Sequence, residues 1–552
     1  MAKQLTVVLE GRSLQCKAGT SIQQLIEEHL PERKADAIAV RAGTAVKGLR
    51  WQPRQDCECA LLTYANEEAR RIYERSARFV LLLAVREVMP GARVRIEHSV
   101  RYGVYITVKC DGGLNSAMVR AFEQRMGEIV QADEPLIRTR WTRQQAMEYF
   151  EADGQTDKLR LLGYRPFEYF DVYTCRGMND YFYGEMLPST GYLRGFSLQF
   201  HLPGMLLQLP APDGPHRPAP IQTRTKLLRT FAEAARWANV LRCDNAADLN
   251  DLIAKNEIRP FMRVNEALHE RGIAAIADQI VQRRARVALI AGPSSSGKTT
   301  FAHRLGIHLR VDGLEPVAVS LDNYYRDRDQ IALGEDGQPD LESIDALDLP
   351  LFNEHLVRLL QGEEVEIPRF SFRTGYRKEE GVPLRLRADQ PILIEGIHGL
   401  NDRLTADIPS GYTFKVYISA LTQLNLDNHN RIRTTDVRLL RRLVRDYKFR
   451  HASVDRTMSL WDSVRAGEEK YIFPFQEQAD AMFNSSLLYE LPILKKHAYP
   501  ILQEVGEDSP WCLRAHRLLK FLHYFLDGPA EDEIPPTSIL REFIGGCSFY
   551  ME

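Results

Sequence analysis

Gly292-Pro293-Ser294-Ser295-Ser296-Gly297-Lys298-Thr299 has the spacing GxxxxGK[ST] of a loop that holds nucleotide phosphates. The apolar run 287–291 before it predicts a buried parallel strand, and residues 299–305 after it predict the start of a helix. In such a loop the glycines let backbone N–H groups turn toward an anion, and the helix N-terminus adds partial positive charge. The alternative is a glycine-serine turn without a ligand, but the strand, the loop and the helix follow one another in the order that a phosphate site requires.

The residues of this loop have separate expected roles. Lys298 is expected to reach the β- and γ-phosphates of ATP and to act in catalysis, and the Thr299 hydroxyl is expected to bind Mg²⁺. The full expected nucleotide-binding set in the loop is Gly292, Ser294, Ser295, Ser296, Gly297, Lys298, Thr299 and Thr300. The cofactors that follow from the motif are therefore ATP and Mg²⁺.

Two acidic residues stand at the ends of further predicted strands. The run 317–321 leads into Asp322, and the run 391–394 leads into Glu395. Because the carboxyl ends of parallel strands meet at one edge of a sheet, both carboxylates should face the loop. Asp322 can then accept the proton of an attacking hydroxyl, and Glu395 can help to hold Mg²⁺. The alternative is a pair of solvated acids at strand ends.

The runs 414–418 and 480–483 predict two more strands. Together these segments predict an α/β fold with a five-stranded parallel sheet and right-handed crossovers. A chain of 552 residues is too long for one hydrophobic core, so further domains are expected around this sheet.

A strongly basic stretch with helical spacing follows the fourth predicted strand. Its cationic residues are Arg438, Arg441, Arg442, Arg445, Lys448 and Arg450. Phosphoryl transfer spreads negative charge over the equatorial oxygens, which a set of arginines on a closing helix can neutralise while excluding water. We expect Arg441 and Arg445 to act in catalysis and Arg442 to bind the nucleotide. The alternatives are a solvated helix face and an RNA-binding patch.

The motifs of residues 286–484 resemble those of uridine/cytidine kinases, which belong with phosphoribulokinase. The matching runs are 322–325 (DNYY), 367–372 (IPRFSF) with Arg377-Lys378, 394–397 (IEGI) and 438–446 (RLLRRLVRD). The resemblance implies that Asp322 is the base on a nucleoside 5′-hydroxyl and that the basic helix is a lid over ATP. It implies a substrate pocket of Tyr325, Glu342, Phe370, Tyr376 and Arg377, in which Glu342 stands for an aspartate on the ribose hydroxyls.

The base-reading positions depart from that family. Phe370 and Gly375 stand where a tyrosine and a histidine read the pyrimidine edge, although Tyr376 or Arg373 could substitute. The expected activity is ATP-dependent phosphorylation of a nucleoside 5′-hydroxyl with an open base preference. A kinase for another small alcohol, such as a sugar phosphate or pantothenate, and an RNA-binding regulatory ATPase are the alternatives.

The first part of the chain resembles a different family. Residues 1–64 show the strand and turn pattern of a β-grasp unit and resemble the TGS domain of threonyl-tRNA synthetases, and residues 65–210 resemble the α+β editing domain that follows it. Arg75 and Phe79 stand in place of the two helix histidines, and Asn179 stands in place of the histidine after Cys175. Editing chemistry is therefore not expected. A scaffold role and retained RNA or nucleotide binding both stay open.

The remaining segments connect and cover these units. Residues 211–224 predict a linker that leads into packing helices up to residue 284, and residues 485–552 predict a helical extension whose apolar tail packs back on the protein. No apolar run approaches the roughly 20 residues of a membrane span. The single close cysteine pair, Cys57 and Cys59, completes no zinc site. We expect a cytoplasmic protein with reduced thiols, with oligomer formation left open.

Overall fold

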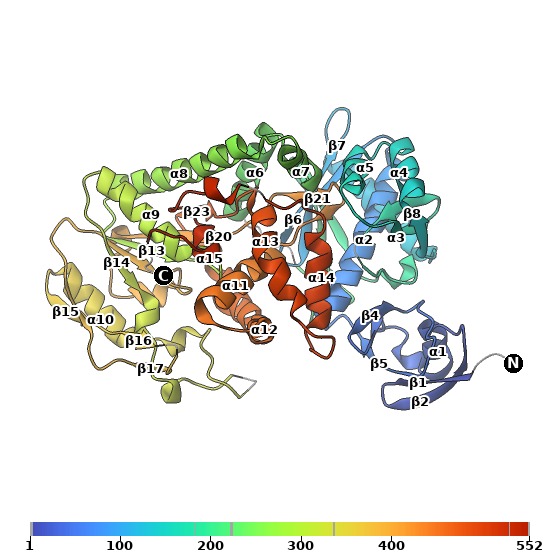
Figure 1. Ribbon diagram of the computed structural model, residues 1–552, viewed down its shortest axis with the longest axis horizontal. Helices are drawn as coiled ribbons and strands as arrows, with labels where there is room; N and C mark the ends of the chain where they lie inside the picture. Colours follow the sequence, from blue (N-terminus) through green and yellow to red (C-terminus); the bar gives the residue numbers. More distant parts are fainter. Residues whose placement is uncertain are drawn as a thin grey trace.

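The computed structural model describes residues 4–182, 184–220, 225–334, 337–371, 373–528 and 530–549. Residues 221–224 of the expected linker and Phe372 of the expected substrate motif lie outside these ranges. In Figure 1 the N-terminal β-rich part lies at one end of the long axis and the parallel sheet at the other, with the C-terminal helices between them.

The N-terminal unit is a mixed sheet with one helix against it. Its strands lie in the order β2-β1-β5-β3-β4. They are β1 (Gln4–Leu9), β2 (Arg12–Lys17), β3 (Ala39–Ala42), β4 (Ala45–Gly48) and β5 (Cys57–Leu62), with helix α1 (Ile22–His29). Ser21 and Gln24 form a capping box that starts α1, so the helix begins where its polar cap stands in the sequence. The architecture agrees with the predicted β-grasp unit.

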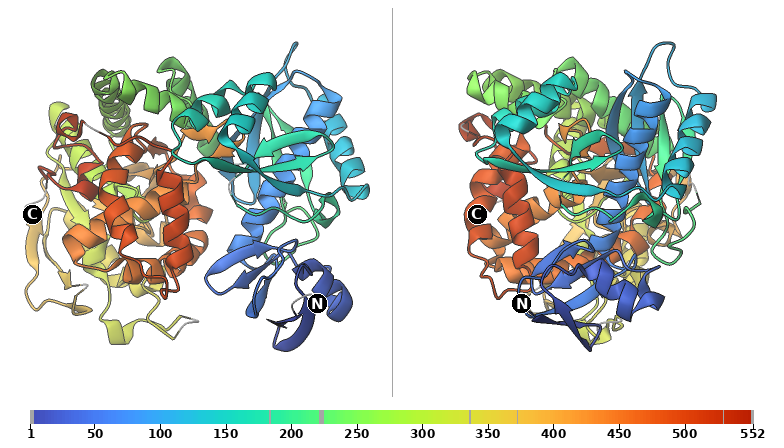
Figure 2. Two further views of the ribbon diagram at one scale, coloured as in Figure 1. Left: turned by 45° about the vertical axis from the view of Figure 1, so that its right-hand side comes forward. Right: turned by 90° about the vertical axis from the view of Figure 1, so that its right-hand side faces the viewer.

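The second region packs one long helix against two antiparallel sheets, ordered β11-β12-β7-β6 and β10-β9-β8. The helices are α2 (Glu67–Val88), α3 (Ser116–Gln131), α4 (Arg143–Ala152) and α5 (Thr156–Gly163). The strands are β6 (Arg93–Val100), β7 (Gly103–Lys109), β8 (Ile137–Thr142), β9 (Tyr169–Cys175), β10 (Met178–Tyr181), β11 (Ser197–His201) and β12 (Gly204–Gln208). Figure 2 shows α2 running through this region. Its residues 79–85 are all buried, which explains the near-continuous apolar run there.

The linking helices are α6 (Thr225–Val240), α7 (Ala246–Ala254) and α8 (Ile258–Arg283). Helix α8 buries Ile273, Ile276 and Ile280 in a core cluster that also contains Ile290 of the parallel sheet and Phe150 of α4. Helices α7 and α8 therefore share one core with both halves of the chain.

The central sheet has the order β14-β19-β13-β20-β23, and all of its neighbouring strands are parallel. Its strands are β13 (Val287–Ala291), β14 (Val317–Ser320), β19 (Ile392–Glu395), β20 (Thr413–Ser419) and β23 (Ala481–Asn484). Every residue of β13 is buried: Ala288 and Ile290 face one core cluster, and Val287 and Leu289 face another. This two-sided burial is the reason for the continuous apolar run, and it confirms the predicted five-stranded parallel sheet.

Helices cover both faces of this sheet. They are α9 (Lys298–Val311), α10 (Leu349–Leu360), α11 (Thr434–Arg450), α12 (Val454–Tyr471), α13 (Glu490–Gln503), α14 (Cys512–Leu522) and the short α15 (Arg541–Ile544). Small antiparallel pairs join β15 (Glu364–Ile367) with β18 (Val382–Arg385), β16 (Phe370–Ser371) with β17 (Tyr376–Arg377), and β21 (Asn425–Asp427) with β22 (Asn430–Arg431). No described helix combines the length and apolarity of a membrane span, and the eight cysteines are free thiols.

The β21–β22 hairpin joins the two halves of the molecule. Asn425 Nδ2 donates to the Ile96 carbonyl at 2.7 Å, and Asn430 Nδ2 donates to the Tyr181 carbonyl at 2.9 Å. Between them, the Asp180 carboxylate contacts His429 Nδ1 at 2.7 Å and forms an ion pair with buried Lys158. Unsatisfied buried polar groups are costly, so this paired cluster fixes the hairpin against the second region.

Candidate functional site

The loop between β13 and α9 needs glycine at both ends. A Cβ on Gly292 would stand 2.0 Å from the Ile418 carbonyl oxygen of β20, so the loop can lie against the sheet edge only without a side chain. Gly297 has φ +85°, and a Cβ there would meet Ile539 at 2.4 Å. The conformation required of a phosphate-binding loop is thus built into the two glycines of the motif.

The polar groups of the loop fit an anion. The Ser295 and Ser296 hydroxyls are buried without a hydrogen-bond partner in the part of the chain that the structure describes. The Lys298 ammonium group donates to the Pro293 carbonyl at 3.3 Å, across the loop. Helix α9 begins at Lys298, so the N–H groups of its first turn point out of its N-terminus. These donors match the needs of a polyphosphate.

Asp322 and Glu395 lie at the same sheet edge as the loop. Asp322 follows β14, Glu395 ends β19, and the Ser320 hydroxyl donates to Glu395 at 2.8 Å. Burial and, to a smaller extent, the Asp322 charge raise the pKa of Glu395 to about 7, while the Lys298 charge acts in the opposite direction. Burial also raises the pKa of Asp322, against the charges of Lys298, Arg450 and Arg445. One ammonium group therefore acts on both carboxylates, as the parallel-strand argument expects.

The expected substrate side contains Tyr325, Glu342 and Phe370. Tyr325 is buried, its hydroxyl donates to the Leu341 carbonyl at 2.9 Å, and its ring lies 5.5 Å from that of Phe370. Burial raises the pKa of Glu342 to about 7, with the Glu468 charge acting in the same direction and the charges of Arg442 and Lys298 acting against it. The charge of the loop residue Lys298 and that of Arg442, which contacts the loop, thus both act on Glu342.

Arg377 and Tyr376 occupy different environments. The Arg377 guanidinium group donates to the Tyr325 carbonyl at 2.9 Å and to Asp348 at 3.2 Å, so it holds the backbone beneath Tyr325. Tyr376 is 47% exposed at the tip of the β16–β17 hairpin. The described contacts give Arg377 a supporting position and leave the Tyr376 ring at the surface; their substrate roles stay predictions.

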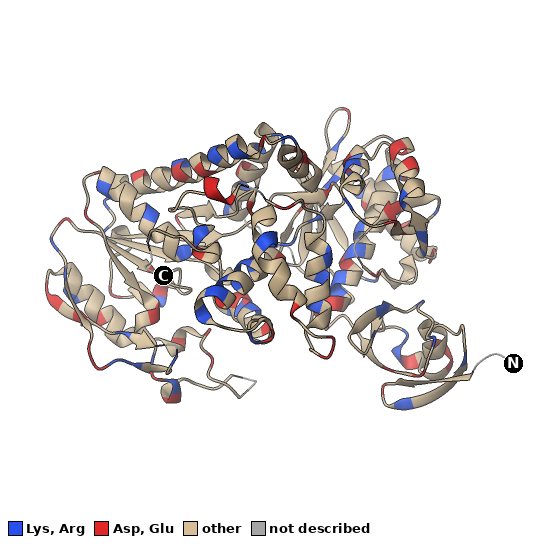
Figure 3. Cartoon of the chain, viewed as in Figure 1, with Lys and Arg blue, Asp and Glu red and all other residues tan. Residues whose placement is uncertain are grey.

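The arginines of α11 reach the loop from the other side. Arg438 donates to the Ser294 carbonyl at 2.9 Å, and Arg442 donates to the Ser294 hydroxyl at 3.1 Å. Arg445 donates to its neighbour Asp446 at 3.1 Å. Figure 3 shows the basic residues along α11 with acidic residues among them, a pattern that differs from a uniformly positive face.

Arg441 is enclosed in the protein. Its side chain is 0% exposed, and it donates to Glu490 at 2.6 Å and to the Ser485 carbonyl at 2.8 Å. It also lies 3.4 Å from the Ser295 carbonyl. The contacts support the loop from behind, and the expected catalytic role of Arg441 stays a prediction.

Glu468 of α12 is a site residue that sequence reasoning missed. Its fully buried carboxylate accepts the Ser294 N–H at 3.0 Å and forms ion pairs with Arg438 and Arg465. It therefore ties the loop to both α11 and α12. An acidic residue in a charged amphipathic helix gives no local signal of such a contact; only the tertiary fold brings it to the loop.

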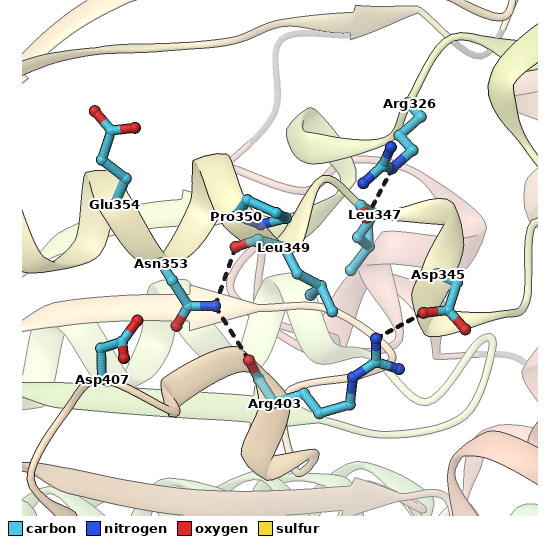
Figure 4. Close-up of a pocket in the computed structure, with 9 residues that line it drawn as sticks. All are labelled: Arg326, Asp345, Leu347, Leu349, Pro350, Asn353, Glu354, Arg403 and Asp407. Carbon is cyan, nitrogen blue, oxygen red and sulfur yellow. Dashed lines mark hydrogen bonds and ion pairs between the residues drawn. The ribbon is translucent and has the colours of Figure 1, made fainter.

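The structure also contains a surface cavity of about 760 Å³ beside the N-terminus of α10. Its lining comprises Arg326, Asp345, Leu347, Leu349, Pro350, Asn353, Glu354, Arg403 and Asp407 (Figure 4). Arg403 pairs with Asp345 at 2.7 Å, and the Asn353 amide donates to the Leu349 and Arg403 carbonyls. None of the expected site residues lines this cavity, so the chemistry assigned to the loop lies elsewhere.

Arg75, Phe79 and Asn179, which stand at the positions aligned with editing histidines, make packing and hydrogen-bonding contacts. Among the described residues there is no group of three His, Cys, Asp or Glu side chains that could hold a metal ion. Arg75 donates to the Glu185 carbonyl, Phe79 is fully buried, and the Asn179 side chain accepts from Thr174 at 2.5 Å. These residues serve packing and local hydrogen bonding.

Different groups of known proteins are similar to the N-terminal region and to residues 287–488. Residues 287–488 match the phosphoribulokinase / uridine kinase family. The threonine–tRNA ligase of Desulforamulus reducens is 24% identical over 190 residues, which cover 34% of this chain and 30% of the ligase. That of Desulfovibrio desulfuricans is 27% identical over 199 residues, which cover 35% of this chain and 31% of the ligase. The chain thus spans less than a third of the length of these relatives.

Two solved structures match part of this chain. A candidate fructose transport system kinase from Silicibacter sp. TM1040 is 18% identical with a TM-score of 0.29, covering 38% of this chain and 98% of that chain. A possible uridine kinase from Bacillus stearothermophilus is 18% identical with a TM-score of 0.23, covering 36% and 89%. Residues 287–488 are a P-loop kinase domain of the phosphoribulokinase / uridine kinase family, preceded by a region that distantly resembles part of threonine–tRNA ligases.

Proposed function

We propose that this protein transfers the γ-phosphoryl group of ATP to the 5′-hydroxyl of a nucleoside. The observation that carries the proposal is the meeting of Lys298, Asp322 and Glu395 at one edge of the parallel sheet, where the lysine charge acts on both carboxylates. A phosphate-binding loop alone would serve any nucleotide-binding protein. A carboxylate beside it that can take a proton from an alcohol points to transfer onto a hydroxyl group.

Each residue then has a defined task. The loop N–H groups, the Lys298 ammonium group and the hydroxyls of Ser295 and Ser296 bind the phosphates. Asp322 accepts the proton of the hydroxyl, and its raised pKa makes it a stronger base than an exposed aspartate. Thr299 and Glu395 would hold Mg²⁺, which supplies positive charge to the phosphate oxygens when bound. Arg442 and Arg445 of α11 bring further positive charge to the loop and to Asp322.

The acceptor binds on the side of Tyr325, Glu342 and Phe370. The Tyr325 and Phe370 rings form an apolar wall on which a flat base can stack. Glu342 offers a carboxylate to the ribose hydroxyls, and the Lys298 and Arg442 charges favour its ionised form. Phe370 and Gly375 supply no side-chain hydrogen bond to a base edge. The proposal therefore includes weak discrimination between bases.

A second candidate is transfer to another small alcohol, such as a sugar phosphate. It is favoured by the same absence of polar base-reading groups at Phe370 and Gly375. The two candidates share the loop, Asp322 and Glu395, and differ only in the acceptor.

A coupled assay of ADP release over nucleosides, sugar phosphates and pantothenate tests the proposal. Turnover that requires uridine, cytidine or another nucleoside, with a nucleoside 5′-monophosphate as product, is the expected result. Turnover with ribulose phosphate and none with any nucleoside selects the second candidate. ATP hydrolysis that depends on tRNA, with no phosphorylated acceptor, contradicts both and points to an RNA-regulated ATPase.

A further inference from the structure

The C-terminal segment 530–549 returns to the phosphate-binding loop and covers it. Ile539, Leu540 and Phe543 are fully buried, in the same core cluster as Ile290 and Phe301. The Ser538 hydroxyl donates to Glu266 of α8 at 2.6 Å. Figure 1 shows α15 beside α11. The segment is therefore a docked part of the fold, as its apolar composition predicts, and it docks on the loop as well as on the linking helices.

Glu542 of this segment occupies the N-terminal end of α9. Its Oε2 accepts the Thr300 hydroxyl at 2.7 Å and the Thr300 N–H at 3.3 Å. Thr300 is in the first turn of α9, whose N–H groups have no partner within the helix. Ile539, three residues earlier, stands against Gly297 of the loop. The protein thus places one of its own carboxylates on a helix end that attracts anions.

The same segment also contacts the basic helix α11. The Arg441 guanidinium group lies 5.0 Å from the centre of the Phe543 ring, and Lys448 donates to the Ile544 carbonyl at 2.7 Å. At the other end of the segment, the Phe549 ring stacks on His303 of α9 at 5.1 Å. Loop, α9 and α11 are therefore all contacted by one short stretch of chain.

We propose that the C-terminal segment is a built-in competitor of the nucleotide, in which Glu542 takes the place of a phosphate on Thr300. The inference rests on the proposed function, because it requires that polyphosphate binds at this loop. A carboxylate and a phosphate on one helix end repel each other, so binding of one weakens binding of the other. Nucleotide binding then withdraws Glu542 from Thr300 and loosens the hold of residues 538–549 on α11.

The competition has a direct test in the full-length protein. Glu542→Gln removes the charge and keeps the shape, and Glu533→Gln is its matched control, since Glu533 pairs with Arg263 on α8, away from the loop. The dissociation constant for ATP is measured by calorimetry for both variants and the wild type. We expect Glu542→Gln to bind ATP about 5- to 150-fold more tightly, the range of a typical coupling between two sites, and Glu533→Gln to bind as the wild type does.

Hydrogen exchange of the wild-type protein gives a second readout that needs no variant. ATP is expected to speed exchange of the amides in residues 538–549. Unchanged exchange there, together with equal or weaker ATP binding by Glu542→Gln, overturns the competitor role and leaves the proposed kinase function standing. If none of the proteins binds ATP, the proposed function fails, and the inference fails with it.

Discussion

Glu74 of α2 accepts a hydrogen bond from Arg433 at 2.9 Å, and Arg433 is the residue that directly precedes α11. Glu74 also contacts Arg431 of β22 at 3.3 Å. The helix that brings Arg438 and Arg442 to the phosphate-binding loop therefore starts from a carboxylate in the synthetase-like region. This contact gives that region a physical task in the kinase: it fixes the base of the basic helix.

Replacing Glu74 should weaken the attachment of the start of α11 to α2. Burial acts to raise the pKa of Glu74, but the Arg433, Arg431 and Arg78 charges hold it well below its usual range. We expect Glu74→Gln to cost about 3–5 kcal/mol, because it leaves largely buried arginines without their partner. The ionised Glu74 carboxylate therefore stabilises the fold above pH ~4. This contribution to the free energy of unfolding is lost as the pH falls further and the carboxylate is protonated.

Thermal unfolding at pH 7 and at pH ~2 measures this effect, because the stabilisation is lost only below pH ~4. Glu68→Gln is the control, since the Glu68 side chain is 45% exposed on the same helix. Equal melting temperatures of Glu74→Gln and the wild type at pH 7 would contradict the assigned role.

Glu342 should show the opposite pH dependence. Because burial raises its pKa to about 7, the folded protein binds a proton there that the unfolded chain releases near pH ~4.3. Its contribution to stability is present below pH ~4 and is lost as the pH rises to 7. Glu342→Gln should therefore melt higher than the wild type at pH 8, by the equivalent of about 2–3 kcal/mol, and equally at pH 4.

The control for Glu342 is Glu363→Gln, whose side chain is 52% exposed. A difference between Glu342→Gln and the wild type that does not change between pH 4 and pH 8 would show that the carboxylate does not titrate as described.

Substitution of Arg441 should mainly lower the stability of the protein, whereas substitution of Arg445 should mainly lower its turnover. Arg441→Ala breaks a pair in which both side chains are at most 2% exposed, so we expect a loss of about 3–5 kcal/mol and a lower melting temperature. Arg445→Ala removes positive charge near Asp322 and should reduce kcat about 100-fold, with a smaller loss of stability than Arg441→Ala because Arg442 and Arg450 still pair with Asp446. Melting curves and kcat of both variants check this, and the reverse pattern would exchange the two roles.

Lys298→Ala should abolish turnover and weaken ATP binding. Lys298 is the one loop side chain that acts electrostatically on Asp322, Glu342 and Glu395 together. We expect kcat to fall about 1000-fold or more and the dissociation constant for ATP to rise. Calorimetry and steady-state kinetics measure both quantities, and unaltered ATP affinity would place the phosphates away from this lysine.

The local part of the site could be predicted from the sequence. Apolar runs, glycine spacing and strand-end acids are written in consecutive residues, and the rule that parallel strands end at one edge brings Asp322 and Glu395 together. The long-range contacts could not be predicted. Glu542 meets Thr300, and Glu468 meets Ser294, through packing between distant segments, and neither pair leaves a periodic pattern. Arg441 looked like a lid residue because helical spacing does not tell a buried face from a closing one.

The most direct test of the central claim is the paired measurement of ATP affinity and kcat for Asp322→Asn. If Asp322 takes the proton of the acceptor hydroxyl, the variant keeps an ATP dissociation constant close to that of the wild type while kcat falls by about 10²- to 10⁴-fold. Full activity of Asp322→Asn with a nucleoside acceptor would contradict the account, because the carboxylate at the sheet edge would then have no part in the transfer.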